Sequence, residues 1–262
     1  MIFSIRQLQE KCWEKHRPLF LAFIHLTKTF DLVRGDGLFK ILKKIGCPPK
    51  LLSMVQSFHE DMKGKVQYDG SSSKPFNINS GVKQGCVLAP TLFGIFFTVL
   101  LKYAFGTSTE GIYLHTCSDG RLFNLAHLKA MSKVRKATIR DILFSDDAAI
   151  VTHTEAELQC LMDCFAKAYD EFGLTISLKK TNVMAQDADP PSIIINNYKL
   201  EAVSEFTYLG STITNNLSLD VELNKRIGKA STTLSRLSQR VWNNSKLTSN
   251  TKISVYRACV LS

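Results

Sequence analysis

The segment from Val87 to Leu101 most constrains the fold, because it carries no charged side chain and consists mainly of bulky apolar residues. A membrane-spanning helix needs about 20 apolar residues. This run is shorter, contains Pro90 and is followed by Lys102. We therefore expect a helix buried in the core of a globular domain, which requires a sheet or further helices to cover it.

Strand and helix patterns alternate along the rest of the chain. The short apolar run from Pro18 to Ile24 is typical of a buried strand. Apolar residues at helical spacing predict helices over residues 38–45 and 51–58. The amphipathic segment from Glu155 to Phe172 predicts a longer helix that ends at Gly173.

Clusters of Gly, Asp and Ser between short apolar runs predict hairpins. The paired strands are expected at residues 65–68 with 76–78, 113–117 with 122–125, and 138–143 with 148–152. Further short strands are expected at residues 176–183, 193–195 and 206–209, with basic helices from Leu217 onward. This order predicts an α+β fold in which an antiparallel sheet is backed by helices.

The composition excludes a largely disordered chain, since 45% of the residues are hydrophobic. The formal net charge of +10 favours a polyanionic partner such as nucleic acid, although many soluble proteins are equally basic. Seven cysteines, an odd number, occur without a secretory signal. We therefore expect reduced thiols in a cytoplasmic or nuclear protein that is not secreted.

Two adjacent aspartates stand between apolar, strand-like runs in the sequence Phe144-Ser145-Asp146-Asp147. Adjacent carboxylates repel each other, which is tolerated in solvent or where a divalent cation neutralises them. Taken alone, the segment fits either a metal site or a plain exposed turn.

A second unusual segment runs from Gly81 to Pro90 and contains Gln84 and Gly85. Glycines allow the backbone to approach a ligand closely, and Pro90 is suited to the start of a helix. A helix-entry loop with incidental glycines accounts for the same residues.

Together with three other segments, these two resemble the motifs of the reverse transcriptase family, specifically its non-LTR (LINE-like) branch. In the family order from motif A to motif E, the segments are Phe23–Asp31, Ser80–Pro90, Phe144–Asp147, Phe172–Leu174 followed by Lys179–Thr181, and Phe206–Gly210. The resemblance implies a polymerase palm with partial fingers and the start of a thumb. Residues 1–200 would form fingers and palm with motifs A to D, and residues 201–262 would hold the primer-grip motif E and the start of the thumb.

The activity implied by this resemblance is RNA-directed DNA synthesis by two Mg²⁺ ions, or Mn²⁺, with an RNA template, a DNA primer and dNTPs as partners. By the same resemblance, Asp146 and Asp147 would bind the metal ions and Lys180 would assist the leaving pyrophosphate. The dNTP and template would contact Phe30, Gln84 and Gly85. The primer would be positioned by Tyr208, Leu209 and Gly210.

The sequence departs from the family at the motif A carboxylate, where His25 stands in place of the catalytic Asp. An imidazole offers one neutral nitrogen and cannot bridge two hard cations. Asp31 lies six residues further, about 20 Å along an extended strand, so we do not expect it to substitute. The resemblance therefore predicts a polymerase that is inactive or impaired.

Two other interpretations fit the sequence. The chain is a non-catalytic, nucleic-acid-binding palm remnant, or it is a remnant that does not fold stably because apolar palm surface is uncovered. The basic candidates for binding are Lys225, Arg226, Lys229, Arg236 and Arg240, which also suit a solvated helix face. Few residues precede motif A, so we expect fingers and endonuclease regions to belong to a larger polyprotein.

Overall fold

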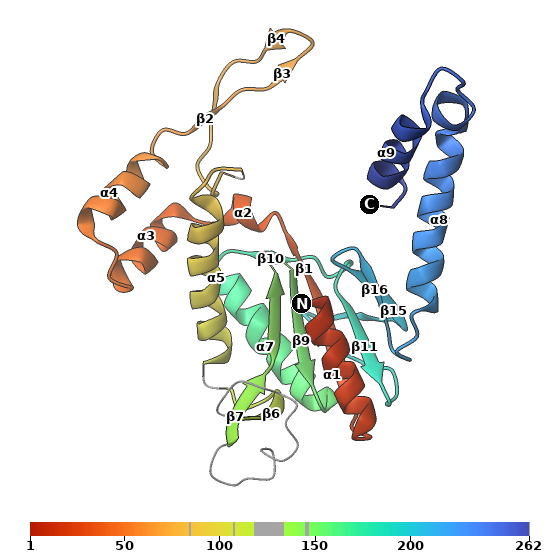
Figure 1. Ribbon diagram of the computed structural model, residues 1–262. Helices are drawn as coiled ribbons and strands as arrows, with labels where there is room; N and C mark the ends of the chain where they lie inside the picture. Colours follow the sequence, from red (N-terminus) through yellow and green to blue (C-terminus); the bar gives the residue numbers. More distant parts are fainter. Residues whose placement is uncertain (84, 107, 118–133, 145–146, 262) are drawn as a thin grey trace. The chain divides into compact units, whose positions relative to one another are not determined.

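The computed structural model describes residues 1–83, 85–106, 108–117, 134–144 and 147–261. The chain forms two compact units (Figure 1). The first consists of Met1 and Lys11–Val203, and the second of Ile2–Glu10 and Ser204–Ser262.

The first unit is built on a sheet with the strand order β14-β11-β1-β9-β8, and β10 pairs with β1 beside this path. The bounds are β1 Leu19–Thr27, β8 Asp141–Phe144, β9 Asp147–Thr152, β10 Thr175–Ile176, β11 Asn182–Gln186 and β14 Glu201–Ala202. These pairings are antiparallel except for β11 with β14. The predicted buried strand is confirmed as β1, and the mixed α+β class is confirmed as well.

Helices α5 (Ala89–Phe105) and α7 (Glu155–Glu171) pack with one face of the sheet into a single apolar core. The predicted core helix is thus confirmed as α5. Helix α7 begins with a capping box between Thr154 and Glu157, and Gly173 follows its end at φ +72°. Among the described residues, no helix is long and apolar enough to span a membrane.

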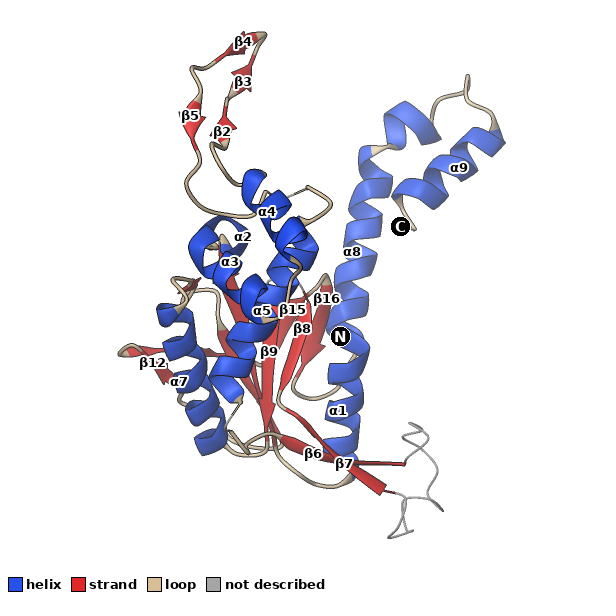
Figure 2. Cartoon of the chain, turned by 90° about the vertical axis from the view of Figure 1, so that its left-hand side faces the viewer, coloured by secondary structure: helices blue, strands red, loops and turns tan. Residues whose placement is uncertain are grey.

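Smaller elements surround this core (Figure 2). They are α2 Thr29–Leu32, α3 Gly35–Lys44, α4 Pro49–Ser57, β2 Lys63–Gly64, β3 Gln67–Tyr68, β4 Ser71–Ser72, β5 Phe76–Asn77, β6 Ile112–Cys117, β7 Val134–Ile139, β12 Ile194–Ile195 and β13 Tyr198–Lys199. A hairpin forms where the first was predicted, but its strands differ from the prediction: β2 pairs with β5, and β3 pairs with β4 instead of with residues 76–78.

The second unit contains a hairpin and helices. Its elements are β15 Glu205–Tyr208, β16 Ser211–Thr214, α8 Asp220–Arg236, a π-helical turn Ser238–Trp242 and α9 Ser249–Cys259, together with residues Ile2–Glu10 of α1, which spans Ile2–Glu14. The basic helices are confirmed, whereas α1 was not predicted.

Two further strand predictions are wrong in their bounds. The expected strand 138–143 divides at Arg140, because residues up to Ile139 pair with β6 while β8 pairs with β9. The partner of β6 is therefore β7, and the expected partner 122–125 lies outside the described residues. The expected strand 176–183 is interrupted by a turn, in which the amides of Lys180 and Thr181 donate to the Ser177 carbonyl.

Candidate active site

The pairing of β1 with β9 places His25 directly opposite Asp147. The imidazole Nδ1 lies 3.5 Å from the carboxylate Oδ1, and the two side chains are 41% and 29% exposed. Their neighbours Ile24 and Ala148 are buried. The polar pair therefore lies where the apolar part of the sheet gives way to solvent.

The backbone of His25 is held from the motif D segment. Its amide donates to Thr181 Oγ1 at 3.3 Å, and its carbonyl accepts from the Ser177 amide at 2.9 Å. The Thr181 hydroxyl in turn donates to the Ser177 carbonyl at 2.9 Å, and Thr181 is buried. These bonds fix the main chain at position 25, from which the side chain extends toward Asp147.

Lys180 is exposed and adjoins Thr181 in this turn. The predicted pyrophosphate-assisting lysine is thus one residue from the threonine that holds His25. Thr181 belongs to the motif D segment, but the sequence predicts no role for it.

The chain turns sharply after β1. Lys28 adopts a left-handed conformation with φ +47°, and α2 follows. The expectation that Asp31 lies at the end of an extended strand is therefore wrong, and the distance calculated on that basis does not apply. The ring of Phe30 stacks on Phe93 of α5 with 4.2 Å between the ring centroids.

The motif B loop is bonded to this turn through the backbone. The amide of Gly81 donates to the Val33 carbonyl at 2.8 Å, and the Val82 amide donates to the Phe30 carbonyl at 2.7 Å. The Ser80 hydroxyl donates to the Asp31 carbonyl at 3.0 Å. Motifs A and B, far apart in the sequence, are therefore joined.

Gly81 is required at this junction. Its φ is +97°, and a Cβ there would lie 2.9 Å from the Asp31 Cα. Gly85 also has a positive φ, +84°, but nothing lies within 4 Å of its Cβ position. Two other predicted site residues, Gln84 of motif B and Asp146 of motif C, lie outside the described residues.

The predicted primer-grip residues belong to the second unit. Leu209 and Gly210 form the turn between β15 and β16, and both have positive φ, which is typical of a type I′ hairpin. Tyr208 is buried at the end of β15.

The hairpin is held from two sides within that unit. The Thr212 amide donates to a Glu222 carboxylate oxygen at 2.6 Å, and its carbonyl accepts from Arg6 at 3.2 Å. The Thr212 amide is the main cause that lowers the pKa of Glu222 to about 2, with Arg226 contributing. Sequence patterns gave no signal for Glu222, because a glutamate in the first turn of a helix is common.

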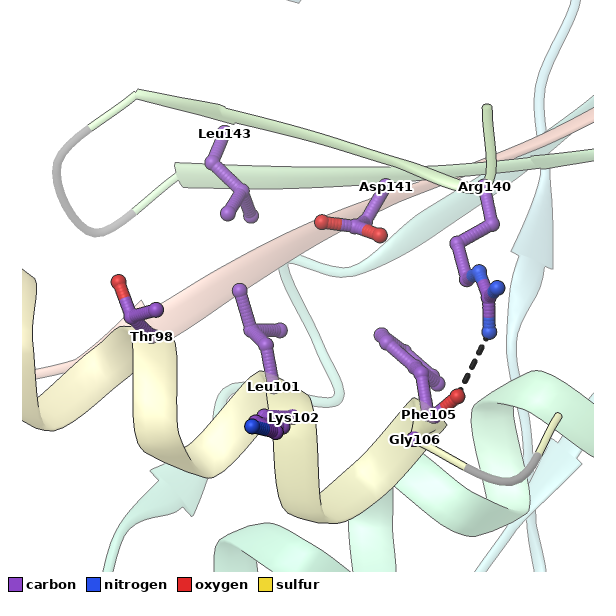
Figure 3. A pocket seen from close by; sticks show the side chains of 8 residues that line it. All are labelled: Thr98, Leu101, Lys102, Phe105, Gly106, Arg140, Asp141 and Leu143. Atoms are coloured by element: carbon purple, nitrogen blue, oxygen red, sulfur yellow. Dashed lines mark hydrogen bonds between the residues drawn. The ribbon is translucent and has the colours of Figure 1, made fainter. Parts of the chain in front are cut away.

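A pocket of about 380 Å³ lies elsewhere, between α5 and β8 (Figure 3). Its described lining contains none of the predicted site residues. Arg140 donates to the Phe105 carbonyl at 2.7 Å and so joins β8 to the end of α5. Burial raises the pKa of Asp141, which also lines the pocket.

Of the two aspartates predicted to bind metal ions, the structure describes Asp147, and Asp146 lies outside the described residues. His25 and Asp147 supply one imidazole and one carboxylate, and the part of the chain that is described contains no group of three or more metal-ligating side chains. Hard cations require several oxygen ligands.

Known proteins resemble this chain in sequence. The sequence model of the reverse transcriptase (RNA-dependent DNA polymerase) family matches residues 2–115 and 118–213. The RNA-directed DNA polymerase from mobile element jockey of Drosophila funebris is 26% identical over 250 residues, which cover 94% of this chain and 25% of that protein. The Pol polyprotein from the type-2 retrotransposable element R2DM of Drosophila melanogaster is 27% identical over 167 residues, or 63% of this chain and 14% of that protein.

Solved structures share the fold. Apo telomerase from Candida tropicalis, truncated from its C-terminal domain, superposes with a TM-score of 0.54 at 14% identity, covering 84% of this chain and 39% of that one. Telomerase from Candida albicans gives a TM-score of 0.52 at 14% identity, and the match covers 88% of this chain and 37% of that one. The palm fold is therefore confirmed. The chain spans about a quarter of the length of its jockey relatives, and it belongs to the reverse transcriptase (RNA-dependent DNA polymerase) family, with non-LTR retrotransposon polymerases as its relatives.

Proposed function

We propose that this chain is the palm portion of an RNA-directed DNA polymerase of a non-LTR retrotransposon, and that its own catalysis is lost or severely reduced. The observation that carries the proposal is the position of His25 opposite Asp147. A neutral imidazole nitrogen suits Zn²⁺, Cu²⁺ or Ni²⁺ better than Mg²⁺ and brings no negative charge to a pair of cations. The substrates by family are dNTPs, a DNA primer and an RNA template.

The roles of the remaining residues are part of the same proposal. Phe30 would face the sugar of the dNTP, with Gln84 and Gly85 beside the nucleotide and template. Phe30 lies in the turn whose backbone is bonded to Val82 of motif B, and this position supports its role beside the dNTP. Lys180 would assist the pyrophosphate, and its nearness to Thr181 supports that role. Tyr208, Leu209 and Gly210 would position the primer.

Primer extension on poly(rA)/oligo(dT) with Mg²⁺ tests the proposal. We expect no extension by the unmodified chain and measurable extension by His25→Asp. The double variant His25→Asp, Asp147→Asn is the matched control and should again be inactive. Robust extension by the unmodified chain would overturn the proposed lesion, and if neither chain extends the primer, the revertant fails to restore the site.

A non-catalytic, nucleic-acid-binding remnant is the second candidate, and the second unit favours it. Lys229, Arg236 and Arg240 are exposed and form no ion pair with a described residue. By contrast, Lys225 pairs with Glu205, and Arg226 pairs with Glu222. The three unpaired cations are therefore the better candidates for phosphate contacts.

Binding of a labelled RNA–DNA hybrid, followed by fluorescence anisotropy at several salt concentrations, tests this candidate. Each phosphate contact adds about 0.9 to the slope of log affinity against log salt. The triple change Lys229→Gln, Arg236→Gln, Arg240→Gln should make this slope shallower, reducing its magnitude by about 2–3. An unchanged slope would assign these cations to a solvated face.

A further inference from the structure

The hairpin of residues 62–78, which contains β2 to β5, extends beyond α4 and the start of α5 (Figures 1 and 2). Every residue from 65 to 80 is exposed. Tyr68 is 82% exposed and Val66 is 59% exposed. A two-stranded hairpin is at best marginally stable alone in water, so bulky side chains at such positions point to a surface that a partner covers.

Backbone hydrogen bonds nevertheless join the two arms of the hairpin. Asp69 and Gly70 both have positive φ and form the turn between β3 and β4. The Ser73 amide donates to the Val66 carbonyl at 2.9 Å, and the Ile78 amide donates to the Met62 carbonyl at 2.8 Å. The exposed side chains are therefore presented on a defined support.

Its two aromatic rings differ in what they contact. The ring of Phe76 covers Gly64, where an added Cβ would lie 2.7 Å from it, so Phe76 packs within the hairpin. Tyr68 makes no ring contact or hydrogen bond with a described residue. Tyr68 also lines a hollow of about 260 Å³ together with Gln67, Asp69, Gly70 and Ser71. Because Tyr68 is 82% exposed, its ring is available for stacking beside groups that form hydrogen bonds.

The charge of the hairpin favours a polyanion. Lys63, Lys65 and Lys74 are exposed, and none forms an ion pair with a described residue. Asp69 is the one carboxylate in this segment. Lysines interleaved with an exposed aromatic ring are typical of surfaces that bind single-stranded nucleic acid, where phosphates meet the cations and bases stack on the ring.

The hairpin also adjoins the candidate site through the chain. Two residues after Ile78, the segment Ser80–Val82 is bonded to Phe30, Asp31 and Val33. The base of the hairpin is therefore tied through the chain to the junction of motifs A and B, while Tyr68 lies beside the turn at its tip.

We propose that this hairpin binds the unpaired RNA template, with Tyr68 stacking on a base and Lys65 and Lys74 contacting phosphates. The inference rests on the proposed function. A polymerase copies a template that is unpaired ahead of the primer end, whereas the primer is paired, so the single strand beside the site is RNA.

Fluorescence anisotropy on the full chain tests this proposal with two labelled RNA–DNA hybrids, one blunt and one with a 5′ oligo(rU) overhang. A base stacked on an aromatic ring contributes enough affinity that its loss costs about tenfold. We expect Tyr68→Ala to weaken binding of the overhang hybrid about tenfold, Tyr68→Phe to keep it, and neither to change binding of the blunt hybrid. Tyr198→Ala, which removes another exposed tyrosine, is the matched control.

A second measurement locates the contact directly. With 4-thiouridine in the overhang, photocrosslinks should map to peptides containing residues 65–74. Equal affinity of Tyr68→Ala and the unmodified chain for the overhang hybrid, with crosslinks elsewhere, would overturn the proposal and leave the hairpin as a protein-facing surface. If that result comes with normal binding of the blunt hybrid, the proposed function still stands. If the unmodified chain binds neither hybrid, the result counts against both the template-binding hairpin and the proposed function.

Discussion

His25 and Asp147 face each other across two neighbouring strands, with Nδ1 3.5 Å from Oδ1. An imidazole beside a carboxylate forms a compatible pair without a metal ion. The resemblance to the family motif implies an aspartate at this place, which would put like charges directly opposite each other. Under the proposed function, histidine at this position would change both the ligand set and the need of the site for a cation.

The melting temperature should show this difference. Directly opposed like charges destabilise an antiparallel pair, so His25→Asp is expected to lower the melting temperature in EDTA. A cation that binds only the folded state raises stability, so millimolar Mg²⁺ should restore the loss. The unmodified chain should melt at the same temperature with and without Mg²⁺. An equal response of both chains to Mg²⁺ would show that position 25 does not control cation binding.

Gly81 should be the least replaceable glycine at the site. Its φ of +97° and the 2.9 Å approach of its Cβ position to the Asp31 Cα leave no room for alanine. We expect Gly81→Ala to lower the free energy of unfolding by about 1–3 kcal/mol, measured by urea denaturation. Gly94 lies within α5 and has nothing within 4 Å of its Cβ position, so Gly94→Ala should instead stabilise by about 0.5–1 kcal/mol. Equal effects would contradict the assigned strain.

Glu222 should make the hairpin of β15 and β16 sensitive to acid. Its pKa is lowered to about 2 by the bond from the Thr212 amide and by Arg226. A carboxylate with a lowered folded pKa contributes stability that is fully present above its unfolded pKa, about 4.3, and is lost as the pH falls toward 2.

Hydrogen exchange of residues 205–214 checks this dependence. Glu222→Gln should expose these amides to faster exchange at pH 7, and the difference from the unmodified chain should shrink at pH 3. Glu201→Gln, at an exposed carboxylate in β14, is the control and should leave their protection unchanged. A difference that persists undiminished at pH 3 would rule out the ionised carboxylate as its source.

The pattern of apolar residues predicted the elements whose side chains form the core. The runs that became β1 and α5 have few alternatives, because no other placement removes so many bulky residues from water. The α1 helix was missed although Ile5, Leu8 and Cys12 have helical spacing and are buried, and no capping side chain marks its start. The strand expected at 176–183 failed because the turn at Ser177 is set by tertiary bonds to His25, which local spacing does not encode.

The candidate site was predictable in its residue types but not in its geometry. The motif resemblance placed His25 and Asp147 in one site, and strand pairing brings them together. It gave no indication that Phe30 stacks on Phe93, because that contact depends on how α5 packs on the turn after β1. The position of Asp31 was also misjudged, because the left-handed conformation of Lys28 ends the strand and the sequence gives no signal for it.

Thr181 should control the site through the backbone of residue 25. Its hydroxyl accepts from the His25 amide and donates to the Ser177 carbonyl, and the residue is buried. Thr181→Val keeps the volume but leaves this amide without its acceptor, which costs about 1–3 kcal/mol. Thr181→Ser keeps the hydroxyl and is the matched control.

The effect is best measured in the His25→Asp background, where primer extension reports on the position of the carboxylate. We expect Thr181→Val to reduce extension by at least tenfold, because small displacements of reacting groups lower rates strongly, and Thr181→Ser to stay close to the parent. Urea denaturation of the same variants separates a misplaced carboxylate from a chain that has unfolded. If the serine variant loses as much activity as the valine variant at equal stability, the threonine methyl group, not the hydroxyl, positions residue 25.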